Sequence, residues 1–130
     1  GVQRLLRDTV KATEKFDDYT LVLALNYGSR TEVQDAVGAY AAAVAAGSEP
    51  PGSPAWDRFQ NYLYTADMPD PDLVIRTSGE ARISNFLLWQ SAYSEYEFVD
   101  TLWPDFTAEE FGRIVGNYAT RDRRFGAVKA

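Results

Sequence analysis

The sequence predicts an α/β domain in which a mostly parallel β-sheet is flanked by helices. Two short apolar runs, Tyr19–Asn26 and Asp72–Arg76, show no alternation of polar and apolar residues, which is typical of strands buried on both faces. Segments with helical spacing follow each run, as in parallel βαβ units. About three strands are predicted, fewer than the roughly five or six of an average sheet. We therefore expect this chain to be an incomplete portion of a larger fold.

Apolar residues at helical spacing predict a helix over residues 1–10 and a second helix of about 15 residues after a turn at Asn26–Arg30. The apolar stripe of the second helix runs from Val33 to Val44. A loop is expected at 47–54, where Gly, Ser and Pro are frequent, and Trp56–Leu63 predicts a short third helix.

The second half of the chain repeats this order. A helix is predicted over 84–93, from its run of large apolar residues, and Tyr96–Val99 predicts a third strand. Thr107 and Glu110 have the spacing of a capping box, which predicts the start of the last helix.

Composition excludes several functional classes. The net charge of −6 argues against a nucleic-acid-binding protein that neutralises many phosphates. The chain has no Cys and no His, so disulfides, thiolate nucleophiles, Cys/His zinc sites and a Ser-His-Asp triad within it are excluded. Any bound metal is expected to be a hard, oxygen-liganded ion such as Mg²⁺. No signal peptide or membrane-spanning run is visible, which predicts a cytoplasmic protein.

Polar residues follow both of the first two predicted strands, where ligands bind in parallel sheets. One group is the turn Asn26–Arg30. The richer group begins with Arg76, continues through a turn at Ser78–Gly79 with its amides expected to be exposed, and places Arg82 and Ser84 at the start of the next predicted helix. Two arginines, hydroxyls and a helix N-terminus suit a phosphate or diphosphate.

A purely structural interpretation of the same residues remains open. Arg76 could pair with Asp70 or Asp72, and Ser84 could do no more than cap a helix, because turns rich in Ser and Gly commonly join strands to helices. Glu80 and Glu95 could together hold Mg²⁺ against a diphosphate, but two carboxylates 15 residues apart are a weak signal.

Residues 71–95, Pro-Asp-Leu-Val-Ile-Arg-Thr-Ser-Gly-Glu-Ala-Arg-Ile-Ser-Asn-Phe-Leu-Leu-Trp-Gln-Ser-Ala-Tyr-Ser-Glu, strongly resemble the signature of cis-prenyltransferases, the undecaprenyl diphosphate synthase family. Asn26–Arg30 is similar to the Asn-Tyr-Gly-Gly-Arg segment of that family, with Ser29 in place of the second Gly. Trp103–Phe106 and Arg123–Gly126 also match in the same order. The resemblance covers about residues 20–126.

One departure from the family pattern limits what this chain is expected to do. The family's Asp-Gly-Asn-Gly-Arg segment, whose aspartate binds the allylic diphosphate through Mg²⁺, does not occur here. We interpret residues 1–130 as the C-terminal portion of a single cis-prenyltransferase domain, whose complete fold has a six-stranded parallel sheet. The resemblance therefore implies that no catalytic residue lies in this portion and that the chain alone is inactive.

The resemblance implies condensation of isopentenyl diphosphate with an allylic prenyl diphosphate, which gives a Z-polyprenyl diphosphate such as undecaprenyl diphosphate. It assigns the diphosphate of isopentenyl diphosphate to Arg76, Arg82, Ser84, Arg124 and Gly126. It assigns the Mg²⁺ cofactor to Glu95. Supporting roles fall to Asp72, Ser78, Glu80, Asn26 and Arg30.

The tail from Arg124 to Gly126 is implied to reach the site of a neighbouring subunit, which predicts a homodimer that releases its product to the membrane and could be peripheral to it. Arg121, Arg123 and Arg124 could instead only stabilise the C-terminal end of the last helix. A non-catalytic subunit of a heteromeric enzyme is the alternative function. Such subunits usually lose the Arg76–Glu80 signature, which this chain keeps. Product length stays open.

Overall fold

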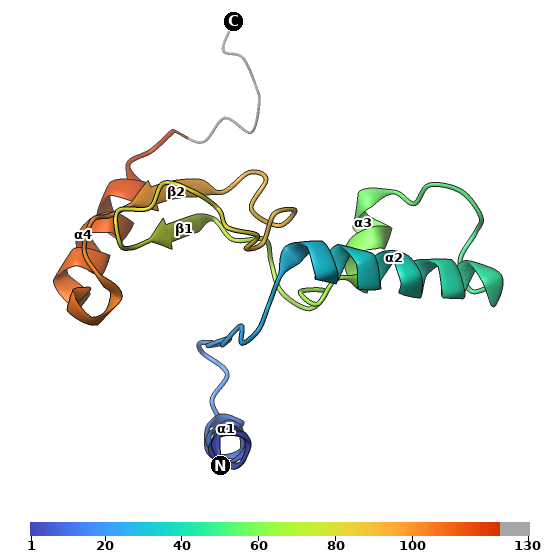
Figure 1. Ribbon diagram of the computed structural model, residues 1–130, viewed down its shortest axis with the longest axis horizontal. Helices are drawn as coiled ribbons and strands as arrows, with labels where there is room; N and C mark the ends of the chain where they lie inside the picture. Colours follow the sequence, from blue (N-terminus) through green and yellow to red (C-terminus); the bar gives the residue numbers. More distant parts are fainter. Residues whose placement is uncertain (123–130) are drawn as a thin grey trace, which may run out of the picture.

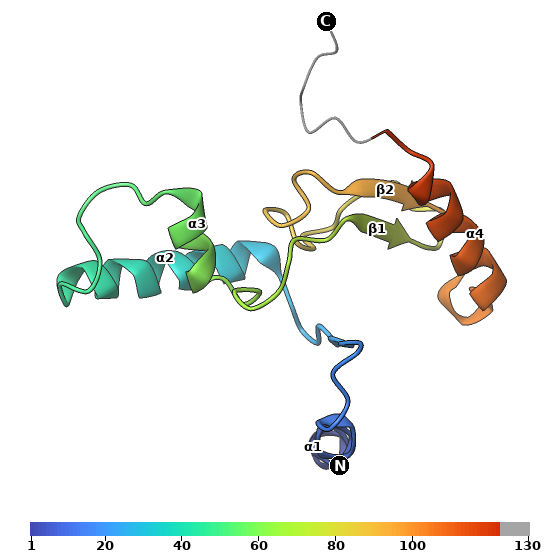
Figure 2. The same ribbon diagram turned by 180° about the vertical axis from the view of Figure 1, so that it is seen from behind.

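The computed structural model describes residues 1–122. In chain order, its elements are α1 (Val2–Thr13), α2 (Ser29–Ala45), α3 (Trp56–Phe59), the 3₁₀ helix η1 (Gln60–Tyr62), β1 (Leu73–Arg76), β2 (Glu95–Phe98), the 3₁₀ helix η2 (Trp103–Asp105) and α4 (Ala108–Ala119). The helices α2 and α3 lie at one end of the long axis, and the sheet and α4 lie at the other (Figure 1, and from behind in Figure 2). The irregular segments that carry the candidate site join the two ends.

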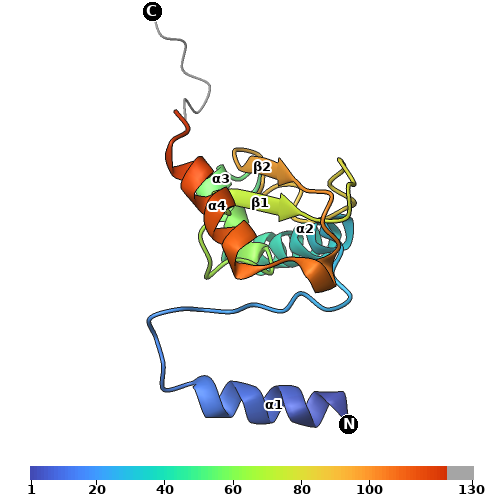
Figure 3. The same ribbon diagram turned by 90° about the vertical axis from the view of Figure 1, so that its left-hand side faces the viewer.

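The first helix and the segment after it lie apart from the rest of the molecule (Figure 3). The helix α1 confirms the prediction for the start of the chain, although none of its residues is buried. The strand predicted at 19–26 is wrong: this segment has no regular secondary structure and ends in a turn, and Tyr19 and Leu21 are 93% and 85% exposed. A strand requires hydrogen bonds to a neighbouring strand, and within residues 1–122 no segment pairs with this one.

The helices α2 and α3 and the 3₁₀ helix η1 lie where helices were predicted. They form one small packing unit. The ring of Tyr40, on α2, meets Phe59 and Tyr62 edge to face, with ring centroids 6.3 and 5.5 Å apart. Ala36 on the same helix and Leu63 after η1 are buried.

The strands β1 and β2 form a two-stranded parallel sheet, in which Leu73 pairs with Glu95 and Arg76 pairs with Phe98. The parallel sheet is confirmed, with two strands instead of about three. The residues of β1 are only partly buried. The described residues therefore do not bury this strand on both faces, contrary to the prediction from the sequence. A core this small is consistent with an incomplete fold.

The connection between the two strands contains no helix, contrary to the prediction for 84–93. Residues 84–93 form consecutive turns, because Ser84, Asn85 and Leu87 have the positive φ angles of 51°, 63° and 47°. Left-handed backbone cannot continue a right-handed α-helix. The apolar spacing of this segment was therefore misleading.

The last helix, α4, begins at the predicted cap. The Glu110 amide N–H donates to the Thr107 hydroxyl (3.2 Å), which is one half of a capping box. The Glu110 carboxylate accepts a hydrogen bond from the Thr101 hydroxyl (3.1 Å) instead of turning back to the cap. Ile114 on this helix is 1% exposed and anchors it. Among residues 1–122, no helix has the length and apolar character needed to span a membrane.

Candidate functional site

The candidate site begins where β1 ends, at Arg76. The turn that follows places Ser78 and Gly79 at φ angles of 74° and 67°, so the chain reverses sharply here. The Ser78 amide donates to the Thr101 carbonyl and the Gly79 amide donates to the Val99 carbonyl, both at 2.9 Å. The expectation of exposed amides was wrong, because the turn uses them to extend the contact with the segment after β2. A diphosphate would have to be held here by side chains.

Glu80 joins the two arginines that the sequence singled out. Its carboxylate accepts a hydrogen bond from Arg76 and forms an ion pair with Arg82 through its other oxygen. The Arg76 hydrogen bond is the main reason why the pKa of the Glu80 carboxyl lies below its ordinary value. Arg76 is thus paired with Glu80, not with Asp70 or Asp72 as the structural interpretation of the sequence suggested. The two predicted anion-binding side chains converge on one point.

A hollow beside this pair combines the two guanidinium groups with an apolar lining. The residues that line it are Val74, Ile75, Arg76, Arg82, Ile83, Phe86, Tyr96 and Phe98. Ser84 lies two residues beyond Arg82, on the exposed left-handed turn instead of a helix N-terminus. The arrangement offers positive charge for an anionic group next to a surface that suits a hydrocarbon.

Glu95, the candidate metal ligand, lies at the opposite end of the sheet from Arg76 and forms an ion pair. Arg121 contacts the Glu95 carboxylate at 3.2 Å and the Glu97 carboxylate at 2.6 Å. Both contacts raise the pKa of the Arg121 guanidinium, and the hydrogen bond with Glu97 contributes most. The Glu95 amide also donates to the Asp72 carbonyl (2.9 Å). Asp72, which was predicted to have a supporting role, thus helps to hold Glu95 through its backbone. Among the described residues, no group of three acidic side chains could hold a metal ion.

The turn at Asn26–Arg30 packs against the segment that carries Ser84. Asn26 has a positive φ of 55°, and Ser29 begins α2 with no exposed surface. The Arg30 amide donates to the Asn85 side-chain oxygen (3.0 Å). The two polar turns predicted at strand ends therefore lie together, although the first strand is not formed.

Sequence reasoning missed Glu32, which is fully buried below this contact. Its carboxylate accepts hydrogen bonds from the Tyr27 hydroxyl, the Tyr64 amide (3.0 Å) and the Gln90 side-chain amide (3.0 Å). No local signal distinguishes it from an exposed helical acid, because two of its partners are 32 and 58 residues away. Gln90, itself 3% exposed, also donates to the Thr65 hydroxyl (2.9 Å).

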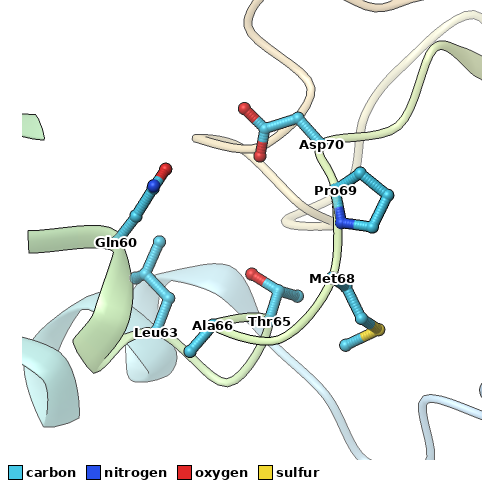
Figure 4. A pocket seen from close by; sticks show the side chains of 7 residues that line it. All are labelled: Gln60, Leu63, Thr65, Ala66, Met68, Pro69 and Asp70. Carbon is cyan, nitrogen blue, oxygen red and sulfur yellow. The ribbon is translucent and has the colours of Figure 1, made fainter. Parts of the chain in front are cut away.

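A second hollow lies between η1 and the start of β1, lined by Gln60, Leu63, Thr65, Ala66, Met68, Pro69 and Asp70 (Figure 4). Its one charged lining residue is Asp70, so it offers no cation for a diphosphate. The predicted residues Arg124 and Gly126 lie outside the described residues. The arginine hollow remains the candidate site.

The fold and the arginine pair define an α/β protein that can bind an anionic group beside the end of a parallel strand. The family model for undecaprenyl diphosphate synthase matches residues 1–126. The chain belongs to this prenyltransferase family, which confirms the resemblance seen in the sequence.

Relatives show how much of such a protein this chain covers. It is 49% identical to an isoprenyl transferase of Thermotoga maritima, over 94% of this chain and 52% of the relative. It is 49% identical to a tritrans,polycis-undecaprenyl-diphosphate synthase (geranylgeranyl-diphosphate specific) of Thermoplasma volcanium, over 93% of this chain and 48% of the relative. The chain thus spans about half the length of these relatives.

A solved structure supports the same fold. Lavandulyl diphosphate synthase from Lavandula x intermedia, in complex with dimethylallyl diphosphate, superimposes with a TM-score of 0.89 at 32% identity. The match covers 96% of this chain and 54% of that protein. The α/β fold and its parallel sheet are therefore those of the family.

Proposed function

We propose that this chain is the C-terminal portion of a cis-prenyltransferase, and that the complete enzyme, which includes the remaining half of the domain, elongates prenyl chains. The complete enzyme would condense isopentenyl diphosphate with an allylic prenyl diphosphate to give a Z-polyprenyl diphosphate such as undecaprenyl diphosphate. The observation that carries this proposal is the convergence of Arg76 and Arg82 on Glu80 beside an apolar hollow. The names of the relatives, which include a polycis-undecaprenyl-diphosphate synthase, support it.

In this proposal the chain binds and orients isopentenyl diphosphate. Arg76, Arg82 and Ser84 hold its diphosphate through charge-assisted hydrogen bonds, and the apolar lining accepts its five-carbon group. The electron pair of its terminal double bond then forms the new carbon–carbon bond to the allylic substrate. The allylic diphosphate leaves with the electrons of its C–O bond, and loss of a proton from isopentenyl C2 creates the cis double bond. The groups that act on the allylic substrate belong to the remaining half.

In the free protein, Glu80 neutralises part of the positive charge of the binding site. Two guanidinium cations and one carboxylate anion leave one unit of positive charge, which still favours a diphosphate. The diphosphate competes with Glu80 for the two arginines. The Ser78 amide holds the end of β1 in place, and the Asp72 carbonyl holds its start. Glu80 thus fixes the two guanidinium groups near each other in the free protein.

Magnesium is the ion that we propose for the complete enzyme, with Glu95 as the contribution of this chain. Mg²⁺ usually keeps several waters and takes one or two carboxylates together with substrate phosphates. Here the Glu95 carboxylate is paired with Arg121, a cation that would repel the ion. Among residues 1–122, no group of three or more acidic side chains could hold the ion without substrate phosphates.

We also propose that the complete enzyme is a cytoplasmic homodimer that delivers its product to a membrane surface. Arg124 and Gly126, in the Arg-Phe-Gly sequence of the tail, would reach the isopentenyl diphosphate site of the partner subunit. The net charge of −6 gives no support to nucleic acid as a partner. Retention of the paired Arg76 and Glu80 counts against the alternative of a non-catalytic subunit.

The deciding experiment is steady-state kinetics of Arg82→Ala in the complete enzyme. Loss of a charge-assisted bond costs about 1.5–3 kcal/mol, so the KM for isopentenyl diphosphate should rise by at least about tenfold. Arg113→Ala is the matched control, because this arginine is 56% exposed against 63% for Arg82 and also pairs with a glutamate. An unchanged KM in Arg82→Ala would refute the assignment. The 130-residue chain by itself should transfer no prenyl group.

A further inference from the structure

The segment that carries Ser84 has a backbone conformation that its own sequence does not favour. Ser84, Asn85 and Leu87 all have positive φ angles, of 51°, 63° and 47°. Left-handed backbone is tolerated by Asn but is costly for other residues with a side chain, and it persists only where the surrounding structure holds it. Something outside the segment must therefore fix the positions of Ser84 and the preceding Arg82.

The N-terminus of α2 supplies that support through Asn85. The first amides of a helix have no partner within the helix, and Gly28 has no side chain with which to cap them. Asn85 takes this role from a distance: its carbonyl accepts from the Ser29 amide (2.9 Å) and its side-chain oxygen accepts from the Arg30 amide (3.0 Å). In return, the buried Ser29 hydroxyl accepts from the Leu88 amide (3.1 Å).

Gly28 makes this close approach possible. A Cβ atom at position 28 would lie 2.8 Å from Nδ2 of Asn85, a distance that real Cβ contacts do not show. The φ of Gly28 is −153°, an ordinary extended value, so the requirement for glycine here is one of space. The Asn85 amide group cannot turn away freely, because its oxygen is bonded to Arg30.

We propose that Asn85 is a positioning residue: by capping α2 it fixes the turn that presents Arg82 and Ser84 to the diphosphate of isopentenyl diphosphate. This inference rests on the proposed function. Asn85 does not itself contact the ligand. Because Asn85 is bonded to the 17-residue helix α2, the irregular segment around it is held in one conformation, and the positions of Arg82 and Ser84 are held with it.

The first test is Asn85→Ala in the complete enzyme, with Thr107→Ala as the matched control. Thr107 is also a helix-capping acceptor, but it caps α4, and its bond with the Glu110 amide lies outside the segment that carries Arg82 and Ser84. We expect Asn85→Ala to raise the KM for isopentenyl diphosphate by about tenfold, with kcat within about twofold, because misplaced binding groups weaken binding. Thr107→Ala should lower thermal stability without changing KM. A KM for Asn85→Ala within about twofold of the parent would overturn the proposal.

The second test uses Gly28→Ala, which keeps every hydrogen-bonding group. It should raise KM in the parent, whereas Gly38→Ala should not, because nothing lies within 4 Å of a Cβ at position 38 of the same helix. In an Asn85→Ala background, Gly28→Ala should add little, because the side chain that it displaces is already gone. Multiplying effects in the double variant would overturn the proposal. So would an unchanged KM in Gly28→Ala alone, a result that does not depend on whether Asn85→Ala folds.

Arg82→Ala distinguishes a wrong diphosphate site from a wrong positioning role of Asn85. If Arg82→Ala leaves KM unchanged, the proposed diphosphate site is wrong, and with it the basis for a positioning role. If Arg82→Ala raises KM while Asn85→Ala and Gly28→Ala do not, the site stands and Asn85 is only a helix cap.

Discussion

Tyr27 donates a hydrogen bond through its hydroxyl to Glu32, whose side chain has no exposed surface. The bond joins the turn before α2 to the centre of the small polar core, where Gln90 donates to the same carboxylate. Burial, followed by the bond to Glu32, raises the pKa of Tyr27 to about 12. Ionised Tyr27 would lose its donor and place a second negative charge beside Glu32.

The complete enzyme should therefore lose stability in strong alkali partly through Tyr27. The pKa of the folded state lies above the ordinary value of 10, so the contribution of neutral Tyr27 is complete below pH 10 and is lost as the pH rises through about 12. In Tyr27→Phe this part of the alkaline loss should be absent. Urea unfolding at pH 9 and pH 11 measures the difference, and Tyr64, whose pKa is also raised, remains in both proteins as a common background. Equal losses in parent and variant would contradict this account.

Glu80→Gln should strengthen the binding of inorganic diphosphate to the complete enzyme. The Glu80 carboxylate occupies both arginines in the free protein, so an uncharged amide would compete less with the anion. We expect a several-fold lower dissociation constant by titration calorimetry, a modest change because the pair is exposed to solvent. Glu110→Gln, which removes the partner of Arg113, is the control. Weaker binding by Glu80→Gln would mean that Glu80 chiefly orients the arginines.

Glu95 and Glu97 share Arg121, which makes them a natural pair for testing the metal assignment. Glu95→Gln should raise the Mg²⁺ concentration needed for half-maximal activity of the complete enzyme. Glu97→Gln removes an equivalent contact with Arg121, so it should cost stability without changing the Mg²⁺ requirement. If both variants shift the Mg²⁺ requirement equally, the effect comes through Arg121 and Glu95 is not a ligand.

Mixed dimers test whether the tail acts in the partner subunit. Complete subunits with Arg124→Ala and complete subunits with Arg76→Ala should each have low activity. In a mixed dimer one site receives an intact Arg76 and an intact tail, so mixing should restore activity. Exchange of subunits is checked by native mass spectrometry. Exchanged mixtures no more active than the two parents would show that Arg124 does not act in trans.

The sequence predicted those elements whose cause is local. Helical spacing of apolar residues was sufficient to predict α2, and the Thr107 cap located the start of α4. The arginine pair was also predictable, because both residues flank one short turn after β1. The Glu80 contact between them needed the structure, since the sequence equally allowed Asp70 or Asp72 as partners of Arg76.

The errors arose where distant parts of the chain decide the local structure. The run at 19–26 has strand-forming residues, but hydrogen bonds from another segment are needed to make it a strand. The segment at 84–93 has helical spacing, yet bonds between Asn85 and the start of α2 hold it in left-handed turns. Glu32 is recognisable only when Gln90, 58 residues later, is brought beside it.

The unpaired segment 19–25 determines how this chain must be handled. Its seven residues, Tyr-Thr-Leu-Val-Leu-Ala-Leu, carry no charge and no proline, and Leu23 and Leu25 are 60% and 64% exposed. Uncharged, strand-forming segments of this length with free backbone groups pair with copies of themselves and form cross-β aggregates. We therefore expect the chain, produced alone at high concentration, to aggregate through this segment. A solubilising fusion at Gly1, or a lysine introduced at position 22, is the practical remedy.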